Sequence, residues 1–302
     1  MTIAQKILRY FVNGILKVYN RNRLTPTSLN VYLERLYFLS SFRYMPKFDN
    51  PQTINEYFVH LKLFGDFNKL ASVADKYAVR EKIKNEIGEK YLLRLYDVVD
   101  DPLMIDEARY QSYPEKFVAK PNHASGRIFV NEKYDYTLFQ ENVKDYLREF
   151  GNTKNEFHYK IIKPKLLIEE FMEPVSGTLY DFKFYLFNGN TEYVMVGENY
   201  LQKKSLKLPD NRRVYTLNWV TADFQKSPLS PTIDKPDKLD EMIDIAETLS
   251  KGWRLMRVDL YLFDDKVKFG EMTPIAGAGR KGFIPQEYDR ILFQKHLGNI
   301  NC

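Results

Sequence analysis

Hydrophobic residues in the first third of the chain recur with helical spacing. Residues 3–19 and 28–42 carry apolar side chains at intervals of three and four, which is typical of helices. A further helical stretch begins near Thr53, which together with Glu56 matches a helix-capping box. Two more helical stretches are expected within residues 66–97. This part of the chain is therefore predicted to be mainly helical.

From residue 116 onward, apolar and polar positions alternate as they do in strands. Strands are expected over residues 116–120, 127–131 and 165–171, in a hairpin over 181–199, and in a last hairpin over 254–273. Helices are expected over residues 136–150 and 236–251. Asn188-Gly189 is a strong signal for the turn of the first hairpin. The Pro-, Ser- and Lys-containing stretch at 201–235 is expected to be an irregular excursion, and the overall class is α+β.

The last hairpin places four polar side chains on one face. Its two apolar runs flank the polar turn FDDK, and a turn centred on Asp265 pairs Asp259 with Glu271 and Arg257 with Thr273. Because side chains alternate between the two faces of a strand, these four residues point to the same side. The opposite side carries the core-type residues Val258, Leu260, Leu262 and Met272.

Two carboxylates on opposed strand positions are a candidate cation site. Their Cβ atoms lie roughly 4.5–5.5 Å apart, so the charges repel unless a proton or a cation lies between them. Mg²⁺ takes oxygen ligands and is commonly held by one or two carboxylates plus substrate phosphates. Asp259 and Glu271 are therefore candidate Mg²⁺ ligands. A solvated hairpin face with an acidic pair is the alternative, and the spacing alone does not decide between them.

The composition is that of a folded chain with an uneven charge. A length of 302 residues is enough for two domains or one large lobed domain. With 44% hydrophobic and 28% charged residues, the chain can bury a sizeable core. Cys302 is the only cysteine, so no disulfide can form within the chain and a reducing cytoplasm fits best. Residues 1–50 carry a net charge of +6, which leaves −1 for the rest. No nucleic-acid partner is expected, because the main body lacks a basic excess.

The basic segment contains an amphipathic helix over residues 3–19. No signal-peptide h-region and no run of 18 apolar residues is evident. The apolar stripe of this helix comprises Ile3, Ile7, Leu8, Phe11, Ile15 and Leu16. Lys6, Arg9 and Lys17 flank it. Packing of the stripe on the protein is the favoured expectation, because Gly14 weakens the helix; peripheral contact with a membrane surface is the alternative.

The loop after the strand at 116–120 is a candidate phosphate site. Lys120 ends that strand, and a loop containing Ser125 and Gly126 follows. Small residues let backbone N–H groups approach phosphate oxygens, and a lysine at the root of the loop adds a positive charge. The spacing differs from that of a Walker loop. An ordinary hairpin turn is the alternative interpretation.

Two later strands also carry polar residues suited to a nucleotide. Glu169 and Glu170 end an apolar strand, where backbone groups and a carboxylate could bind an adenine ring. Asp181 and Lys183 share a strand face, so the carboxylate could accept from ribose hydroxyls and the lysine could bind phosphate or carboxylate. Solvated strand ends and a polar sheet surface are the alternatives.

Taken in order, these motifs resemble the ATP-grasp superfamily, and more narrowly the TupA-like ATP-grasp proteins of bacterial surface-polysaccharide biosynthesis. The resemblance rests on ADKYAVREKI followed by IGEKYL, then FVAKPNHASG, DFKFYLFNG, RVDLY and FGEMTPIAGAG, and it covers roughly residues 50–290. It implies an ATP-grasp fold with two α+β lobes that sandwich a nucleotide. The expected division is a helical region at 1–74, a first lobe at 75–170 and a second lobe at 171–302.

The resemblance also implies roles for individual residues. The nucleotide would be held by Lys76 or Arg80, by Lys120, by the loop residues His123, Ser125 and Gly126, by the adenine hinge Glu169, Glu170, Phe171 and Met172, and by Asp181 at the ribose. The implied Mg²⁺ ligands are Asp259, Glu271 and Thr273, and the implied catalytic residues are Arg257 and Lys183. Thr273 stands where many relatives carry Asn, which makes it a weaker ligand. Ala124 replaces an expected Gly in the loop.

The implied activity is that of an ADP-forming carboxylate–amine ligase that uses ATP and Mg²⁺ and passes through an acyl phosphate. Its substrates would be an amino acid or peptide and a uronic-acid-containing capsular or surface polysaccharide or its precursor. The excursion at 201–235 and the GAGRKGF stretch would lie on the substrate side. One alternative is an ATP-dependent phosphotransferase that acts on a sugar or glycan. The other is a non-catalytic, ATP-binding component of a polysaccharide-assembly complex. The sequence does not indicate an oligomeric state.

Overall fold

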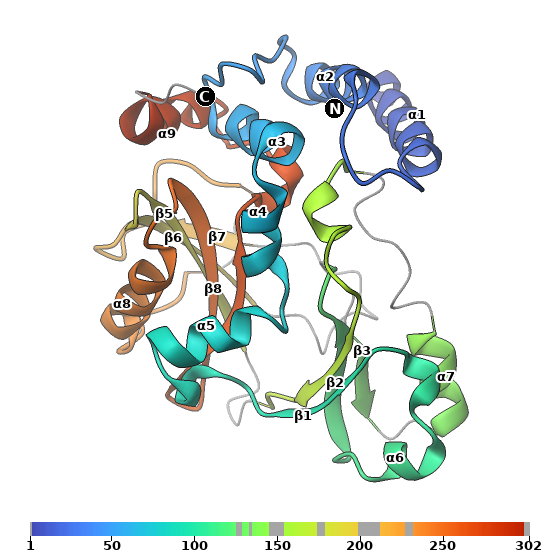
Figure 1. The fold of residues 1–302 in the computed structure, drawn as a ribbon. Helices are drawn as coiled ribbons and strands as arrows, with labels where there is room; N and C mark the ends of the chain where they lie inside the picture. Colours follow the sequence, from blue (N-terminus) through green and yellow to red (C-terminus); the bar gives the residue numbers. More distant parts are fainter. Residues whose placement is uncertain are drawn as a thin grey trace.

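The computed structural model shows two antiparallel sheets joined and flanked by helices (Figure 1). It describes residues 2–124, 129–132, 135–144, 154–173, 179–198, 212–226 and 232–298. Within these residues, no helix combines the length and the apolar character needed to cross a membrane. The predicted α+β class is confirmed.

Five helices open the chain, as the hydrophobic spacing predicts. They are α1 (Ile3–Tyr19), α2 (Ser28–Phe42), α3 (Ile54–Phe64), α4 (Phe67–Ala74) and α5 (Val79–Glu86). Side-chain caps define where α3 and α4 begin: Thr53 accepts from the backbone N–H of Glu56, and Asp66 accepts from that of Lys69. Such caps satisfy N–H groups that have no partner inside the helix. The carboxylate of Glu56 accepts instead from the N–H groups of Lys47 and Gln52.

The first sheet has four strands in the order β1-β4-β2-β3. Its strands are β1 (Leu95–Val99), β2 (Lys116–Pro121), β3 (Phe129–Glu132) and β4 (Leu166–Glu170). Residues 95–97 were predicted to end a helical stretch, and that prediction is wrong. Pairing with the apolar β4 makes them part of a strand instead, with Val99 opposite Leu166. Helices α6 (Glu107–Gln111) and α7 (Tyr136–Val143) supply Tyr110 and Phe139 to the core of this sheet.

The second sheet has five strands in the order β7-β6-β5-β8-β9. Its strands are β5 (Tyr180–Phe187), β6 (Asn190–Glu198), β7 (Arg212–Tyr215), β8 (Leu255–Phe263) and β9 (Lys266–Thr273). Asn188 and Gly189 form the predicted two-residue turn, both with positive φ. Short 3-10 helices and α9 complete the described elements: Glu89–Tyr91, Pro102–Met104, Phe157–Tyr159, Ala276–Gly279 and α9 (Tyr288–Leu297).

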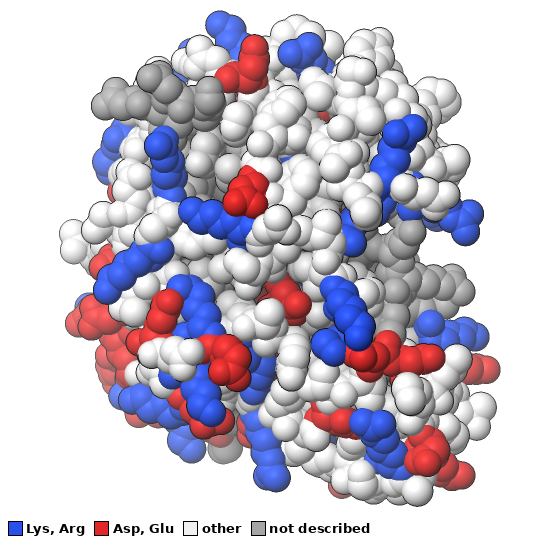
Figure 2. All heavy atoms as spheres, viewed as in Figure 1, with Lys and Arg blue, Asp and Glu red and all other residues white. Residues whose placement is uncertain are grey.

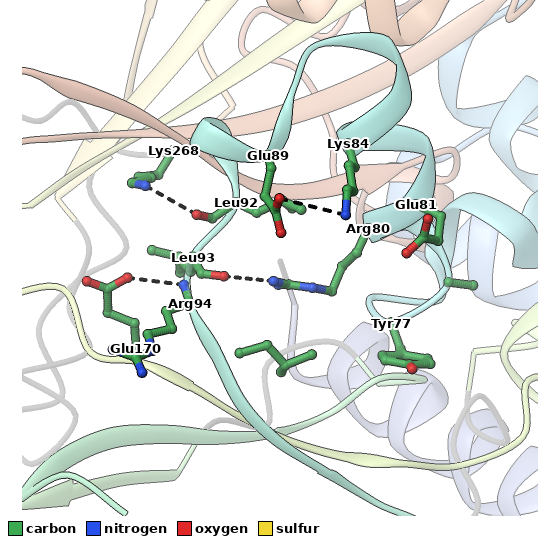
Figure 3. A pocket seen from close by; sticks show the side chains of 12 residues that line it. Tyr77, Arg80, Glu81, Lys84, Glu89, Leu92, Leu93, Arg94, Glu170 and Lys268 are labelled. Atoms are coloured by element: carbon green, nitrogen blue, oxygen red, sulfur yellow. Dashed lines mark hydrogen bonds and ion pairs between the residues drawn. The ribbon is translucent and has the colours of Figure 1, made fainter.

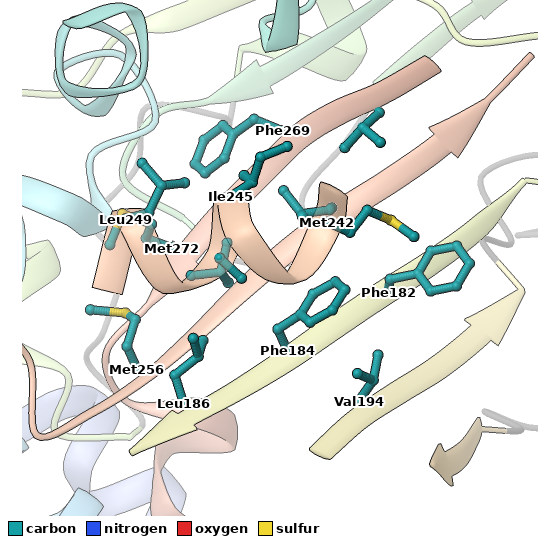
Figure 4. Close-up of a cluster of buried hydrophobic side chains, with 14 of the residues drawn as sticks. Phe182, Phe184, Leu186, Val194, Met242, Ile245, Leu249, Met256, Phe269 and Met272 are labelled. Carbon is teal, nitrogen blue, oxygen red and sulfur yellow. The ribbon is translucent and has the colours of Figure 1, made fainter. Parts of the chain in front are cut away.

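One face of the second sheet packs against α8 (Leu239–Ser250) (Figure 4). Met242 and Leu249 of the helix are fully buried and face Phe184 and Met256 of the strands. The other face is divided along its length. One end packs against α3 and α9 in a second apolar cluster, whereas the other end carries charged side chains. The polar end therefore faces away from the α8 layer, toward the first sheet.

The predicted packing of the α1 stripe is wrong for half of its residues. Ile3, Ile7 and Phe11 are 77%, 63% and 64% exposed, whereas Leu16 is fully buried. Val12, which was not assigned to the stripe, is buried beside Leu16 and packs with Leu33 of α2. The apolar surface of α1 extends around the helix, and α2 covers only one side of it.

Candidate functional site

The hairpin of β8 and β9 has the predicted register. Arg257 lies opposite Thr273, and Asp259 lies opposite Glu271. The turn itself is one step shorter than expected, with Phe263 opposite Lys266. An irregularity between Asp259 and Leu260, opposite the extra residue Gly270, restores the register beyond it. The bulge thus places the two carboxylates opposite each other.

Gly270→Ala is expected to lower the free energy of unfolding by about 1–3 kcal/mol, the usual cost of overpacking. A Cβ at this position would lie 2.9 Å from the ring of Tyr261 and 3.0 Å from the carbonyl oxygen of Asp259. Urea denaturation measures the change. Gly14→Ala is the matched control, because its added Cβ meets no atom within 4 Å beyond its chain neighbours and the backbone of its own helix, and alanine favours a helix. Equal stability of wild type and Gly270→Ala would show that the bulge does not require glycine.

Strand β5 adds a third row of polar side chains next to the hairpin. Its register places Lys183 opposite Asp259 and Tyr185 opposite Arg257. The Lys183 ammonium lies 2.6 Å from Asp259 Oδ2 and also binds the carboxylate of Asp181. Three neighbouring strands therefore bring these charges together, as the alternation predicts.

Arg257 connects the residues of the hairpin face. Its Nε donates to Asp259 Oδ1 at 2.6 Å, and its Nη2 donates to Glu271 Oε1 at 2.7 Å and to the Thr273 hydroxyl at 2.9 Å. The same Nη2 donates to Asp259 Oδ2 at 2.8 Å. The guanidinium therefore lies between the two carboxylates and compensates their repulsion.

Glu271 is the more accessible of the two carboxylates. Its side chain is 29% exposed, against 2% for Asp259. Burial alone would raise the pKa of Glu271, but the charges of Lys76 and Arg257 outweigh it and lower the pKa to about 2. Glu271 is therefore ionised throughout the neutral range, as an oxygen ligand for a cation must be.

The first sheet contributes a second cluster of charges. The Lys120 ammonium at the end of β2 lies 2.5 Å from Glu169 Oε2 on β4. Arg80 of α5 binds the other oxygen of Glu169 at 3.1 Å and donates to the carbonyl of Leu93 at 2.7 Å. Glu169 thus engages both cations, and its expected contact with an adenine amine stays a prediction.

Lys76 links the two clusters. Its ammonium donates to the carbonyl oxygen of Ala124 at 2.7 Å and lies 3.8 Å from Glu271 Oε2. Burial lowers the pKa of Lys76, while the charge of Glu271 opposes that effect. Lys76 therefore joins the loop after β2 to the hairpin of the second sheet. Arg80, the other candidate, contacts Glu169 rather than the hairpin.

The remaining candidates for the adenine hinge and the ribose contact differ in burial and in hydrogen bonding. Met172 is buried with Leu93 and Leu179, Phe171 is half-buried, and Glu170 Oε2 accepts from the backbone N–H of Arg94 at 3.1 Å. Asp181 Oδ1 is buried and has no hydrogen-bond partner among the described residues.

The loop candidates are only partly described. His123 is 2% exposed, so the structure places its side chain inside the protein. Ser125 and Gly126 lie outside the described residues, and their proposed phosphate contacts stay predictions. The excursion at 201–235 is described only for residues 212–226 and 232–235.

A cavity of about 610 Å³ opens beside the hinge (Figure 3). Arg80 and Glu170 line it together with Lys84, Arg94 and Lys268. Lys268 donates to the carbonyl oxygen of Leu92 at 3.2 Å. The sequence interpretation did not include Arg94 or Lys268, because only the tertiary fold brings these two segments of the chain together at the cavity.

Tyr185 is a further residue that the sequence interpretation missed. It follows Asp181 and Lys183 at the same two-residue spacing, so the alternation itself was a usable signal. Burial would raise the pKa of Tyr185, but the nearby charges of Lys226 and Arg257 lower it overall. Its ring stacks on that of Tyr193 with 4.6 Å between centroids. Tyr185 marks the boundary between the charged end and the apolar end of this face.

The arginine of the GAGRKGF stretch belongs to a buried ion-pair cluster. Arg280 is buried and binds both oxygens of Glu34, at 3.0 and 2.8 Å. Lys62 donates to Glu34 at 2.8 Å and to the carbonyl of Ala278 at 2.7 Å. Arg280 therefore anchors the Gly-rich turn to α2 and α3, and the expected place of the GAGRKGF stretch on the substrate side stays a prediction.

The donor set of the hairpin suits a cation that arrives with phosphates. Among the described residues, no group of three His, Cys, Asp or Glu side chains is arranged to hold a metal ion. Three basic groups (Lys76, Lys183, Arg257) balance three acidic ones (Asp181, Asp259, Glu271). A divalent cation alone would add uncompensated charge to a largely buried site, whereas phosphate oxygens would compensate it and complete its coordination. The residues fit Mg²⁺ bound together with a nucleotide.

Comparison with known proteins gives a family match over most of the chain. A family model described as TupA-like ATPgrasp matches residues 58–296. No curated protein matches.

Among solved structures, D-alanine–D-alanine ligase from Helicobacter pylori is similar at 15% identity and a TM-score of 0.44, over 76% of this chain and 60% of that one. The Bacillus anthracis enzyme complexed with ATP is 14% identical with a TM-score of 0.39, over 69% and 56%. Phosphoribosylamine–glycine ligase from Thermotoga maritima is 11% identical with a TM-score of 0.41, over 68% and 48%. The chain spans about half to three fifths of the length of these structures.

Proposed function

The chain belongs to the TupA-like ATP-grasp family, and on this basis we propose that it is an ADP-forming carboxylate–amine ligase. Its products would be amides that join an amino acid or peptide to a uronic-acid-containing surface polysaccharide or its precursor. The observation that carries the proposal is the cluster in which Lys76 approaches Glu271 while Arg257 joins Glu271 to Asp259. This cluster has both the cations that a polyphosphate needs and the carboxylates that its metal ion needs.

The nucleotide roles follow from which groups face one another. Lys76 and Lys120 are the proposed phosphate contacts. Both side chains are largely buried and lie near a carboxylate (Glu271 and Glu169), and phosphate oxygens of a bound nucleotide can take the place of that carboxylate. Lys76 is preferred over Arg80, since it faces the metal carboxylate. Asp181 has an unpartnered oxygen suited to a ribose hydroxyl. The backbone of residues 169–172 is the proposed adenine contact.

The metal-binding roles fall on the hairpin. Asp259 and Glu271 would hold Mg²⁺, which supplies neutralisation of the phosphate charge when bound. The Thr273 hydroxyl accepts from Arg257 and donates to Glu271 Oε1 at 3.2 Å. Thr273 is therefore better placed to orient Glu271 than to serve as a strong ligand.

The reaction consists of two transfers. The γ-phosphoryl group passes from ATP to a carboxylate oxygen of the first substrate, the bond to the β-phosphate oxygen breaks, and ADP is formed. The amine nitrogen then attacks the acyl carbon, the bond to the phosphate oxygen breaks, and the nitrogen loses a proton to give an amide and phosphate. Arg257 stabilises the developing oxyanion, and Lys183 helps to keep Asp259 ionised. Exclusion of water protects the acyl phosphate from hydrolysis.

An ADP-release assay tests the proposal. Amino acids and uronic-acid acceptors are supplied singly and in pairs, and products are identified by mass spectrometry. The proposed ligase releases ADP and forms an amide only when an amine and a carboxylate are both present. A phosphorylated sugar formed without an amine would instead establish a phosphotransferase. Nucleotide binding without ADP release under any pairing would contradict catalysis.

A further inference from the structure

Helix α1 presents an exposed apolar stripe along its outer side. Ile3, Ile7 and Phe11 continue to Val18, which is 78% exposed, and Tyr10 beside them is 85% exposed. Their spacing of three, four and seven residues keeps them on one side of the helix. Figure 1 shows α1 at the outer edge of the molecule, next to α2. The stripe is therefore continuous and faces away from the protein.

The opposite side of α1 fixes the helix in place. Val12 and Leu16 are buried against Leu33 of α2, and Arg9 donates to the Ser40 hydroxyl at 3.3 Å. A capping box at Thr2 satisfies the first turn. Because these contacts hold the helix without using the outer stripe, the stripe is already formed and oriented before any partner binds.

The exposed charges of residues 2–48, which include α1 and α2, have a single sign. Every exposed charged residue between positions 2 and 48 is basic: Lys6, Lys17, Arg21, Arg23, Arg43 and Lys47. The only acid in this interval, Glu34, is fully buried under Arg280 and Lys62. In Figure 2, basic and uncharged side chains cover the edge where Figure 1 places α1. An apolar stripe with basic flanks is complementary to a surface that combines negative charge with an apolar layer beneath.

A second exposed apolar pair provides a contrast. Leu103 and Met104 are 70% and 67% exposed, but their exposed neighbours Asp100, Asp101 and Asp106 are acidic. The nearest exposed charges along the chain are acidic here, and Asp100 pairs with Lys163 and Lys165, so exposed apolar side chains do not always lie among basic residues alone. The combination is a property of the α1 surface.

We propose that α1 docks on an anionic phospholipid surface, with the stripe Ile3, Ile7, Phe11 and Val18 in the interface and Lys6, Lys17 and Arg21 against the headgroups. The helix lies along the surface, because its flanking cations need to stay at headgroup level. A second copy of this chain fits less well, since two such faces would bring like charges together across a symmetric interface. This proposal does not rest on the proposed function.

Vesicle flotation with the full chain tests the docking. Wild type is expected to float with phosphatidylcholine–phosphatidylglycerol vesicles and not with phosphatidylcholine alone, and added salt should release it. Ile3→Ser/Ile7→Ser/Phe11→Ser should weaken binding about tenfold or more, because it removes most of the inserted apolar area. Lys6→Gln/Lys17→Gln/Arg21→Gln should also weaken binding to the anionic vesicles, because it removes the cations that lie against the headgroups. Leu103→Ser/Met104→Ser is the matched control and should bind as wild type.

Three results would overturn the docking. Wild type could fail to float with anionic vesicles, or the triple serine variant could float as well as wild type. Alternatively, sedimentation could show a wild-type dimer that becomes a monomer in the triple serine variant, which would assign the stripe to self-association. Circular dichroism and thermal unfolding of each variant verify that the fold is retained; the glutamine variant changes no apolar residue and so tests the proposal separately.

Discussion

Glu271→Gln is expected to reduce ATP turnover by about a hundredfold or more, because it removes one of the two proposed carboxylate ligands of the metal ion. The substitution keeps the size of the side chain and its hydrogen bonds to Arg257 and Thr273, so the fold should be retained. It also leaves Lys76 without its carboxylate partner at 3.8 Å. Steady-state ADP release and thermal unfolding distinguish loss of activity from loss of structure.

Glu192→Gln is the matched control for this substitution. Glu192 lies on β6 of the same sheet, its side chain is 23% exposed, and it also pairs with a lysine, Lys295. Turnover of the control should stay close to wild type. Undiminished turnover of Glu271→Gln would remove Glu271 from the metal site.

Glu34→Gln is expected to lower the free energy of unfolding by about 3–5 kcal/mol, because it leaves two cations buried without their carboxylate. Glu34, Lys62 and Arg280 are all buried, and Glu34 joins the other two. Burial alone would raise the pKa of Glu34, but the charges of Arg280 and Lys62 lower it to about 2. Lys62 carries the cost of burial, which lowers its pKa to about 8 despite Glu34.

The pH dependence of this difference gives a second measurement. The folded-state pKa of Glu34 is below its ordinary value of 4.5, so its ionisation stabilises the fold above pH 4.5. That contribution, on the order of 3 kcal/mol, is lost as pH falls from 4.5 toward 2. Chemical denaturation should therefore show that the difference in free energy of unfolding between wild type and Glu34→Gln becomes smaller as the pH falls over this range. Asp100→Asn, which breaks the exposed pairs with Lys163 and Lys165, is the control and should leave the free energy of unfolding close to that of wild type, because solvent screens exposed ion pairs. A constant difference would contradict the assignment of the charge to Glu34.

The charged face of the second sheet was predictable from the sequence because strand alternation is a local rule. The residues of one strand that share a face are fixed by counting in twos, which placed Arg257 with Asp259 and Asp181 with Lys183. The pairing of Asp259 with Glu271 was predicted from a turn centred on Asp265. In the observed turn Phe263 lies opposite Lys266 rather than Val267, and the extra residue Gly270 in the bulge restores the predicted pairing beyond it. A glycine within an alternating strand is itself a signal for such a bulge.

Contacts between distant segments were not predictable in the same way. Arg280 and Glu34 are separated by 246 positions, and no local pattern indicates that a Gly-rich turn packs on α2 and α3. The same limit explains why β1 was interpreted as part of a helix and why the covered side of α1 was misplaced. Helical spacing identifies the apolar positions of a helix, but the neighbour that covers them is a property of tertiary packing.

The most direct test of the central claim is the Mg²⁺ dependence of nucleotide binding, measured by titration calorimetry with a non-hydrolysable ATP analogue. Wild type is predicted to bind the analogue much more tightly with Mg²⁺ than with EDTA, and to bind Mg²⁺ only weakly without nucleotide. In Asp259→Asn/Glu271→Gln, the gain in affinity from Mg²⁺ should disappear while weak, metal-independent binding through Lys76 and Lys120 remains. A double variant that retains the full gain from Mg²⁺ would contradict the assignment of the β8–β9 hairpin as the Mg·ATP site.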